Sequence, residues 1–361
     1  MATPNLLLHA ISAVPEPRLR RTLGELDLIR RLEEAGAGRW RLGLAVPEDG
    51  WPVASIAAAV NSAARQVGVE GMELEPMPMD AAAQEALATR LRIGRPSRPG
   101  GAGSRTRVFS IASGKGGVGK SSVTANTAVA LARRGHDVAV LDADVWGFSL
   151  PRMLGVSESP AVVGGLIVPP AAHGVRVISM DFFVPPDQAV VWRGPMLHKA
   201  LEQFLDEVFW DEPEFLLLDL PPGTGDVPIS LSQLVPGALT VVVTTPQVTA
   251  QRVARRAALM VEKVEQELAG VVENMSWFTG DDGRRYEIFG SGGGQALADE
   301  LSVPLLGRVP LVLAVREGAD RGDPAVVAAP DSEAAAAFDE IAARLSDARP
   351  RVRRRPELHV E

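Results

Sequence analysis

Residues 108–122 read VFSIASGKGGVGKSS, an apolar run followed by a glycine-rich loop and then by a helical pattern. The loop fits G-x-x-x-x-G-K-[ST], the pattern of a phosphate-binding P-loop, in the strand–loop–helix context that this pattern requires. Glycines let the backbone curl so that its N–H groups point at phosphate oxygens, and the following helix adds its positive N-terminal end. The residues expected to bind a nucleotide are Gly114, Lys115, Gly116, Gly117, Val118, Gly119, Lys120, Ser121 and Ser122.

Lysine is rare in this chain, and its placement in the loop is informative. Only four of the 37 basic residues are lysines, and two of them, Lys115 and Lys120, lie in the loop. Lysine is a compact point charge, whereas arginine is a wide planar fork. We expect Lys120 to reach the β- and γ-phosphates of ATP and Ser121 to bind Mg²⁺.

Short apolar runs alternate with helical patterns on the C-terminal side of the loop. Strands are expected at 108–113, 138–142, 175–180, 215–220, 239–245, 269–274 and 304–309, and helices at 123–134, 196–208, 249–267, 294–301 and 331–346, the last with Asp331 as its N-cap. Runs that are apolar on both faces are typical of buried parallel strands. The fold class predicted is therefore α/β, with a doubly wound, mainly parallel sheet.

A change of composition divides the chain. Residues 94–106 read GRPSRPGGAGSRT, in which eight of 13 residues are Gly, Pro or Ser, as in a flexible linker. The linker separates a domain at 1–93 from a P-loop domain at 107–346, and 347–361 read as a charged tail. The first domain is expected to be a small α+β module, with strands at 39–46 and 71–76 and a helix at 51–67.

Carboxylates stand at the ends of two predicted strands. Asp142 and Asp144 follow one strand, and Asp219 ends the apolar run FLLLD, which is typical of a Walker B strand. Because carboxyl ends of parallel strands meet at one edge, Asp219 is expected to hold Mg²⁺ beside the P-loop. The stretch that follows, LPPGTGD, has two prolines that stiffen its start and two glycines that allow its end to bend. This combination suits a loop that switches with the γ-phosphate. Asp142, Pro222, Gly223, Thr224 and Asp226 are the predicted switch residues.

Composition excludes several classes of function. A net charge of −8 implies no general affinity for nucleic acid or an anionic membrane. No apolar run reaches the roughly 18 residues of a membrane span, and no signal peptide is evident, so a cytoplasmic location is expected. Cysteine is absent, which excludes disulfides and thiolate metal sites, and the five histidines show no ligand spacing.

The loop KGGVGKS resembles the deviant Walker A family that contains MinD, ParA, ArsA and the nitrogenase iron protein. This resemblance implies a homodimer in which Lys115 crosses the interface to the partner's nucleotide. It also implies that Asp144 positions the attacking water, which makes Lys115 and Asp144 the candidate catalytic residues. Asn274, in the stretch VVENM, is implied to contact the adenine base.

Further stretches resemble one particular branch of this family. LDADVWGFSLPRMLG, LLLDLPPGTGDVPISL, GVVENMSWF and FGSGGG are similar to the Mrp-type (ApbC-like) iron–sulfur cluster carrier ATPases across about 107–325. Residues 9–92 resemble, more weakly, the small domain that often precedes that ATPase, with Trp51 where a cysteine often stands. The resemblance implies an ATP-hydrolysing carrier that transfers clusters to apoprotein clients.

One departure from that family concerns the ligands of the iron–sulfur cluster. The C-x-x-C pair that usually precedes F-G-S-G-G-G is absent here, where residues 277–286 read WFTGDDGRRY. Because clusters are held mainly by thiolates, one can be bound here only with ligands from a client or a small thiol. Two alternatives stay open: an ATP-gated dimeric scaffold that binds clients, and a MinD/ParA-like positioning ATPase.

Overall fold

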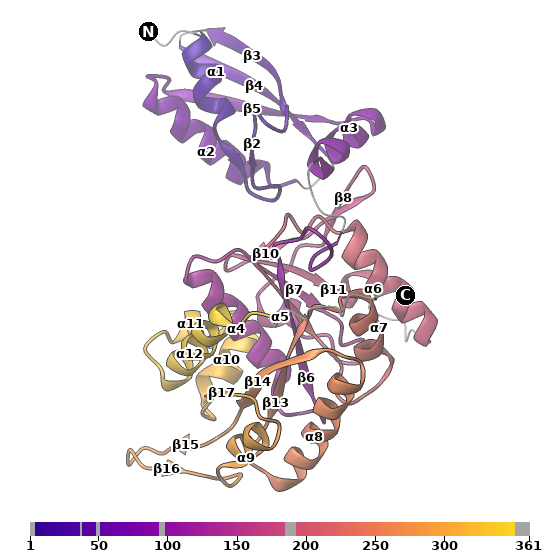
Figure 1. Ribbon diagram of the computed structural model, residues 1–361. Coiled ribbons are helices and arrows are strands. Elements are labelled where there is room, and N and C mark those ends of the chain that lie inside the picture. Colours follow the sequence, from indigo (N-terminus) through magenta and orange to yellow (C-terminus); the bar gives the residue numbers. More distant parts are fainter. Residues whose placement is uncertain (1–3, 37, 48–50, 94–97, 185–192, 351–361) are drawn as a thin grey trace, which may run out of the picture. The chain divides into compact units, whose positions relative to one another are not determined.

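The computed structural model describes residues 4–36, 38–47, 51–93, 98–184 and 193–350 (Figure 1). The chain forms two compact units. Unit 1 contains Met1–Arg95, Pro160–Pro169 and Glu207–Phe209, and unit 2 contains the remainder. The predicted tail at 347–361 lies mostly outside the described residues, as do residues 94–97 of the predicted linker.

Unit 2 is built on one eight-stranded sheet. Its order is β10-β11-β7-β12-β6-β13-β14-β17, and every neighbouring pair is parallel except β10 with β11. The strands are β6 (Arg107–Ser113), β7 (Val138–Asp142), β10 (Ala171–Ala172), β11 (Val175–Ser179), β12 (Phe215–Asp219), β13 (Leu239–Thr244), β14 (Glu267–Glu273) and β17 (Leu305–Arg308). All residues of β7, β11, β12 and β13 are buried, as expected for central parallel strands covered on both faces, and their sequences are accordingly rich in apolar residues.

Helices cover both faces of this sheet, as Figure 1 shows. They are α4 (Lys120–Arg133), α5 (Leu150–Met153), α6 (Gly194–Glu207), α7 (Asp226–Leu234), α8 (Val248–Lys263), α9 (Gly293–Glu300), α10 (Leu313–Arg321), α11 (Ala325–Ala328) and α12 (Glu333–Asp347), with the 3-10 turn η1 (Met180–Phe183). The main core joins α4 and α12 to the sheet, and a smaller cluster joins α8 and α9 to it. The doubly wound fold is confirmed. Among the described residues, no helix is both long and apolar enough to cross a membrane.

The predicted helix boundaries differ from the observed ones by up to four residues, and two of these differences have a clear local cause. Helix α12 is capped by Ser332, whose hydroxyl oxygen accepts from the backbone N–H of Ala335 at 3.2 Å, rather than by Asp331. Helix α8 ends at Lys263, short of the predicted 267, because Glu265 adopts a left-handed backbone with φ of 59°. A residue in that conformation cannot continue an α-helix.

Unit 1 is a small α+β module. Its sheet has the order β3-β4-β5, with β3 (Ile29–Gly36) antiparallel and β5 (Gly71–Pro78) parallel to the central β4 (Arg39–Val46). The other elements are α1 (Pro4–Ser12), β1 (Pro15–Glu16), β2 (Arg21–Thr22), α2 (Val53–Gln66) and α3 (Ala81–Arg92). Strand β3 was not predicted, because its charged residues form an exposed edge that lacks the apolar alternation of a half-buried strand.

A hairpin from the middle of the chain belongs to the core of unit 1. It consists of β8 (Ala161–Val163) and β9 (Leu166–Val168), and its residues Ala161, Val163, Leu166 and Val168 are buried with Leu87 and Ala88 of α3. The sequence places this hairpin between β7 and β11, so a continuous second domain at 107–346 does not describe the observed packing.

Part of the predicted linker is fixed on unit 2. The guanidinium of Arg98 donates to both carboxylate oxygens of Asp206 in α6, at 2.8 and 2.7 Å. Such a bidentate pair restrains both side chains. Residues 98–103 therefore form turns, tied to Asp206 through Arg98 and held by the bond from the Gly100 N–H to Ser104 Oγ, rather than a free linker.

Candidate nucleotide site

The P-loop leaves β6 at Ser113 and ends where α4 begins at Lys120. Gly117 and Gly119 have φ of 80° and 77°, a left-handed backbone that favours glycine. A Cβ on Gly114 would collide with the backbone of α8 at Val253 and Ala254, so this position also requires glycine. The loop borders a cavity of about 180 Å³ lined by Ser113, residues 115–122, Asp144, Ser149, Met153 and Pro222.

Asp219 gathers three side chains from α4. Its Oδ2 accepts from Lys120 Nζ at 2.6 Å and from Ser121 Oγ at 2.5 Å, and its Oδ1 accepts from Thr124 Oγ1 at 2.6 Å. Asp219 is fully buried, so the ammonium of Lys120 supplies the counter-charge that a buried carboxylate needs. The predicted P-loop and Walker B residues are thus in direct contact. Thr124, which sequence reasoning missed, follows Lys120 by one helical turn.

Asp142 organises the loop that carries Asp144. Its Oδ2 accepts from the backbone N–H groups of Ser149 and Leu150 at 3.0 and 3.1 Å, and its Oδ1 accepts from that of Asp144 at 3.2 Å. Burial and the nearby charge of Asp219 raise the pKa of Asp142 to about 7. Asp142 therefore acts here as an anchor for the backbone of this loop.

Asp144 faces the P-loop lysine. Its Oδ2 lies 3.6 Å from Lys120 Nζ, and it borders the same cavity as the loop. Partial burial raises the pKa of Asp144, while the positive charge of Lys120 lowers it. The structure therefore places the candidate water-positioning carboxylate beside the site where Lys120 would meet phosphate.

Lys115 points toward the start of α8. Its Nζ donates to Oε1 of Gln247, the N-cap residue of that helix, at 3.2 Å. Sequence reasoning missed Gln247, although it follows β13, whose carboxyl end lies at the same sheet edge as that of β6. The action of Lys115 across a dimer interface stays a prediction.

Asn274 is hydrogen-bonded to the backbone of the P-loop. It follows β14, and its Nδ2 donates to the backbone carbonyl of Val118 at 2.8 Å. A Cβ on Gly119 would collide with this amide, which gives Gly119 a second reason to be glycine. Contact between Asn274 and a base stays a prediction, but its hold on the P-loop is a structural role that the sequence did not indicate.

The predicted switch loop lies beside the P-loop. Pro222 borders the cavity, and the backbone N–H of Gly223 donates to the carbonyl of Ser113 at 2.8 Å. Gly223 has a left-handed φ of 94°, Thr224 follows on the surface, and Asp226 begins α7. This backbone hydrogen bond connects the predicted switch loop to the end of β6, so a movement of the loop would be transmitted to the start of the P-loop.

The donor set at the P-loop fits Mg²⁺. Ser121 Oγ and Asp219 Oδ2 are hard oxygen donors that already converge within 2.5 Å of each other. Magnesium prefers such donors and keeps waters and phosphate oxygens in its other positions. When bound, it would neutralise charge on the phosphates of a nucleotide.

The loop where relatives of the resembled family carry cysteines is a closed hairpin. Strands β15 (Phe278–Thr279) and β16 (Arg285–Tyr286) flank the turn, and the backbone N–H of Gly280 donates to the carbonyl of Arg284 at 2.9 Å. Asp282 accepts from the Tyr286 hydroxyl at 2.8 Å, so its carboxylate already has a partner.

This hairpin does not fit a sulfide-rich cluster. The whole chain contains no cysteine. Across the described ranges, no three His, Asp or Glu side chains gather as metal ligands. The two carboxylates of the turn are hard donors that suit such a cluster poorly.

Together, the parallel sheet, the P-loop and the Walker B carboxylate define a nucleotide-binding P-loop NTPase. Residues 104–346 match the ParA family described as NUBPL iron-transfer P-loop NTPase, and the chain belongs to this family. It is 43% identical over 351 residues to the iron–sulfur cluster carrier protein of Mycobacterium tuberculosis, covering 94% of this chain and 92% of that protein.

Two solved structures are similar to this chain in fold. The nucleotide-binding protein of Archaeoglobus fulgidus in complex with ADP has a TM-score of 0.55 and 33% identity, covering 61% of this chain and 88% of that one. The cell division ATPase MinD of Pyrococcus furiosus has a TM-score of 0.51 and 29% identity, covering 66% of this chain and 98% of that one.

Proposed function

We propose that this protein binds ATP with Mg²⁺, hydrolyses it as a homodimer, and couples this cycle to the transfer of iron–sulfur clusters to apoproteins. The observation that carries the ATPase part is the convergence of Lys120, Ser121, Asp144 and Asp219 at the P-loop. The transfer part is supported by the family and by the names of the relatives. A cytoplasmic location is part of this proposal.

Each group of the candidate site has its own role in the proposed hydrolysis. The P-loop N–H groups and Lys120 bind phosphate oxygens, and Ser121 and Asp219 hold Mg²⁺. Asp144 orients the attacking water, and Lys115 of the partner subunit adds positive charge at the phosphate. The switch loop from Pro222 to Asp226 then follows the presence of the γ-phosphate.

The cluster is cargo whose ligands come from outside this chain. With no cysteine of its own, the protein acts on clusters held by a client's thiolates or by a small thiol. The role left to this chain is to bind the client and to time the exchange by its nucleotide state.

Calorimetry of ATP binding and assays of phosphate release, with wild type, Lys120→Ala and Asp144→Ala, test the ATPase part. Transfer is tested with a cluster held by glutathione and an apoprotein that has four cysteine ligands. ATP should accelerate transfer by the wild type and not by Lys120→Ala. ATP binding without turnover would favour the dimeric scaffold, and absence of binding would refute the proposal.

A further inference from the structure

Helix α8 presents a basic stripe on its exposed face. Arg252, Arg256, Leu259 and Lys263 are spaced by four, three and four residues and are all exposed, so they lie on one side of the helix. The opposite side of α8 is apolar and packs on the sheet. The stripe therefore contributes nothing to the core.

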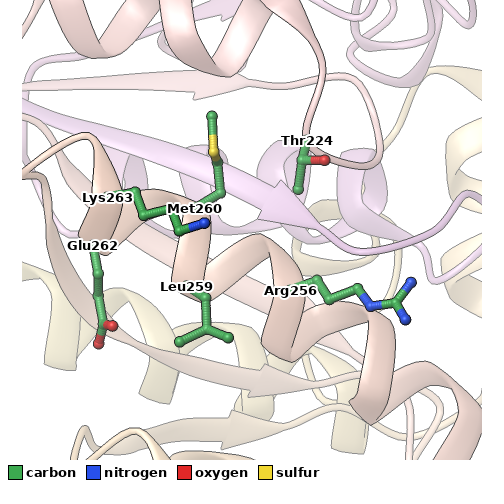
Figure 2. A pocket seen from close by; sticks show the side chains of 6 residues that line it. All are labelled: Thr224, Arg256, Leu259, Met260, Glu262 and Lys263. Atoms are coloured by element: carbon green, nitrogen blue, oxygen red, sulfur yellow. The ribbon is translucent and has the colours of Figure 1, made fainter.

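A groove of about 520 Å³ lies along this stripe, and Figure 2 shows the side chains around it. Arg256 and Lys263 stand at its two ends, with Leu259 and Met260 between them. Thr224 of the predicted switch loop lines the other side, and Glu262 is the single acidic side chain among the described residues of the lining. The groove thus combines two apolar side chains, Leu259 and Met260, with a cation at each end.

The cations of this stripe are not neutralised by the described part of the chain. Within the described ranges, no carboxylate forms an ion pair with Arg252, Arg256 or Lys263. The neighbouring Arg255, in contrast, is paired with Glu300 at 2.5 Å. Three cations without an ion pair among the described residues therefore share one helix face, in a chain whose net charge is −8. Their charge is available to a ligand.

We infer that this groove docks an acidic amphipathic helix of a partner protein. Carboxylates of the partner pair with Arg256 and Lys263, with Arg252 extending the contact, while apolar side chains rest on Leu259 and Met260. An amphipathic helix laid in a groove offers apolar and charged side chains at matching helical spacings.

Two other occupants fit the groove less well. Nucleic acid favours a broad basic surface with little apolar area, and this chain is acidic overall. A nucleotide or free phosphate would leave Leu259, 39% exposed, and Met260 without a partner. The pairing of charge with apolar surface is what favours a peptide.

The groove is also joined to the nucleotide site. The backbone of α8 at Val253 and Ala254 is in close contact with Gly114, and Gln247 at its start binds Lys115. Thr224, across the groove, belongs to the predicted switch loop. Docking is therefore expected to respond to nucleotide, a consequence that rests on the proposed function, whereas docking itself does not.

Fluorescence anisotropy tests the docking with the full chain and no nucleotide. The probe is a synthetic amphipathic helix with leucines on one stripe and glutamates beside them. The double variant Arg256→Glu/Lys263→Glu should weaken binding by about tenfold or more, which corresponds to about 1.4 kcal/mol. Leu259→Ser, which keeps the charge, should weaken it several-fold.

The matched control is Arg133→Glu/Arg321→Glu, which changes the net charge equally at exposed residues of α4 and α10. Equal weakening by this control would overturn the inference, because binding would then follow net charge alone. So would equally tight binding of a probe with lysines in place of the glutamates, or tighter binding of a DNA duplex that depends on Arg256 and Lys263. A change of dimerisation in the groove variant, by sedimentation, would assign the face to a second copy of this chain and overturn it as well.

The nucleotide response is measured with ADP and with ATP on Asp144→Ala, in which hydrolysis is expected to be slow. A severalfold difference in probe affinity is expected. Equal affinities, with calorimetry showing that ATP is bound, would refute the link to the switch loop while leaving the proposed ATPase intact. Failure of ATP to bind would instead refute the proposed function.

Discussion

Lys120 of the P-loop and Asp219 of the Walker B strand form a buried ion pair, with Nζ 2.6 Å from Oδ2. The lysine side chain is 6% exposed and the aspartate is fully buried. The two groups that we propose to bind phosphate and Mg²⁺ therefore neutralise each other directly. A bound nucleotide with its metal would offer anionic phosphate to Lys120 and cationic Mg²⁺ to Asp219. Binding would therefore exchange partners without leaving a buried charge unpaired.

We expect Lys120→Ala to abolish detectable ATP binding in calorimetry, because the phosphates lose their nearest compact counter-charge. It should also lower the free energy of unfolding by about 3 kcal/mol or more, since Asp219 is left buried without its cation. Asp219→Asn in the same background removes the orphaned charge and should recover part of that stability, but not the binding. Wild-type ATP affinity in Lys120→Ala would contradict the P-loop assignment.

Asp144→Ala should keep ATP affinity within a few-fold of wild type and slow hydrolysis by about a hundredfold or more. The reason is that placing a water is a task of the transition state, not of ground-state binding. Single-turnover phosphate release, measured beside calorimetric binding, separates the two effects. Asp181→Ala, at an exposed aspartate of η1, serves as the control. Turnover at the wild-type rate would remove Asp144 from the mechanism.

Mixing two inactive proteins tests whether Lys115 acts across a dimer interface. A mixed dimer of Lys115→Ala and Asp144→Ala subunits carries one site with both groups intact, so about half of the per-dimer activity should return in that species. Within one chain, Lys115 lies 3.2 Å from Gln247, and Gln247→Ala should leave the complementation in place. No recovered activity, after subunit exchange is shown by labelled subunits, would favour action within one subunit.

Unit 1 provides a prediction that depends on pH. Burial raises the pKa of Glu16, while hydrogen bonds from the backbone of Leu19 and from Trp51 Nε1, at 3.1 Å, oppose the rise. A raised pKa in the folded state means that this group's contribution to stability falls as pH rises from about 4.5 through the folded value. Trp51→Phe removes a donor to the ionised carboxylate and raises that pKa further.

The loss of stability in Trp51→Phe should therefore be about 2 kcal/mol at pH 8 and clearly smaller at pH 4, since the protonated carboxyl depends less on the donor. Circular dichroism during urea denaturation measures it. Trp40→Phe, at another buried tryptophan of unit 1, is the control and should show no such pH dependence. An equal loss at both pH values for Trp51→Phe would show that Glu16 is not ionised when folded.

The fold, and the contact of the P-loop with Asp219 in the candidate site, were largely predictable because their signals are local. The P-loop, the strand ending at Asp219 and the loop after Asp142 are each read from adjacent residues. Gln247 and Thr124 were missed because their roles depend on which strands and helical turns become neighbours. The hairpin at 160–169 was missed for the same reason: its apolar residues show that it is buried, but not that α3 buries it.

The last prediction concerns the cargo. The purified protein alone should hold no stable [4Fe–4S] cluster after anaerobic reconstitution with iron and sulfide. A bridging cluster in the resembled family takes two thiolates from each subunit, and this chain has none. The turn that should face a partner subunit is instead a closed hairpin, with Asp282 bound to Tyr286 and with Trp277 and Thr279 donating to Glu333 at 2.9 and 3.1 Å.

Opening that hairpin to ligate iron would break these bonds and offer only hard carboxylate oxygens to a sulfide-rich cluster, an exchange that is unfavourable on both counts. A relative with an intact C-x-x-C pair, reconstituted in parallel, shows that the conditions support cluster assembly. The decisive measurement is absorbance with iron and sulfide analysis after gel filtration in the absence of added thiol. A stoichiometric brown species would prove ligation without cysteine and would refute the assignment of the cluster's ligands to the client. If the same chromophore is retained only when glutathione or a cysteine-bearing client is present, the chain is acting on a cluster that another molecule ligates.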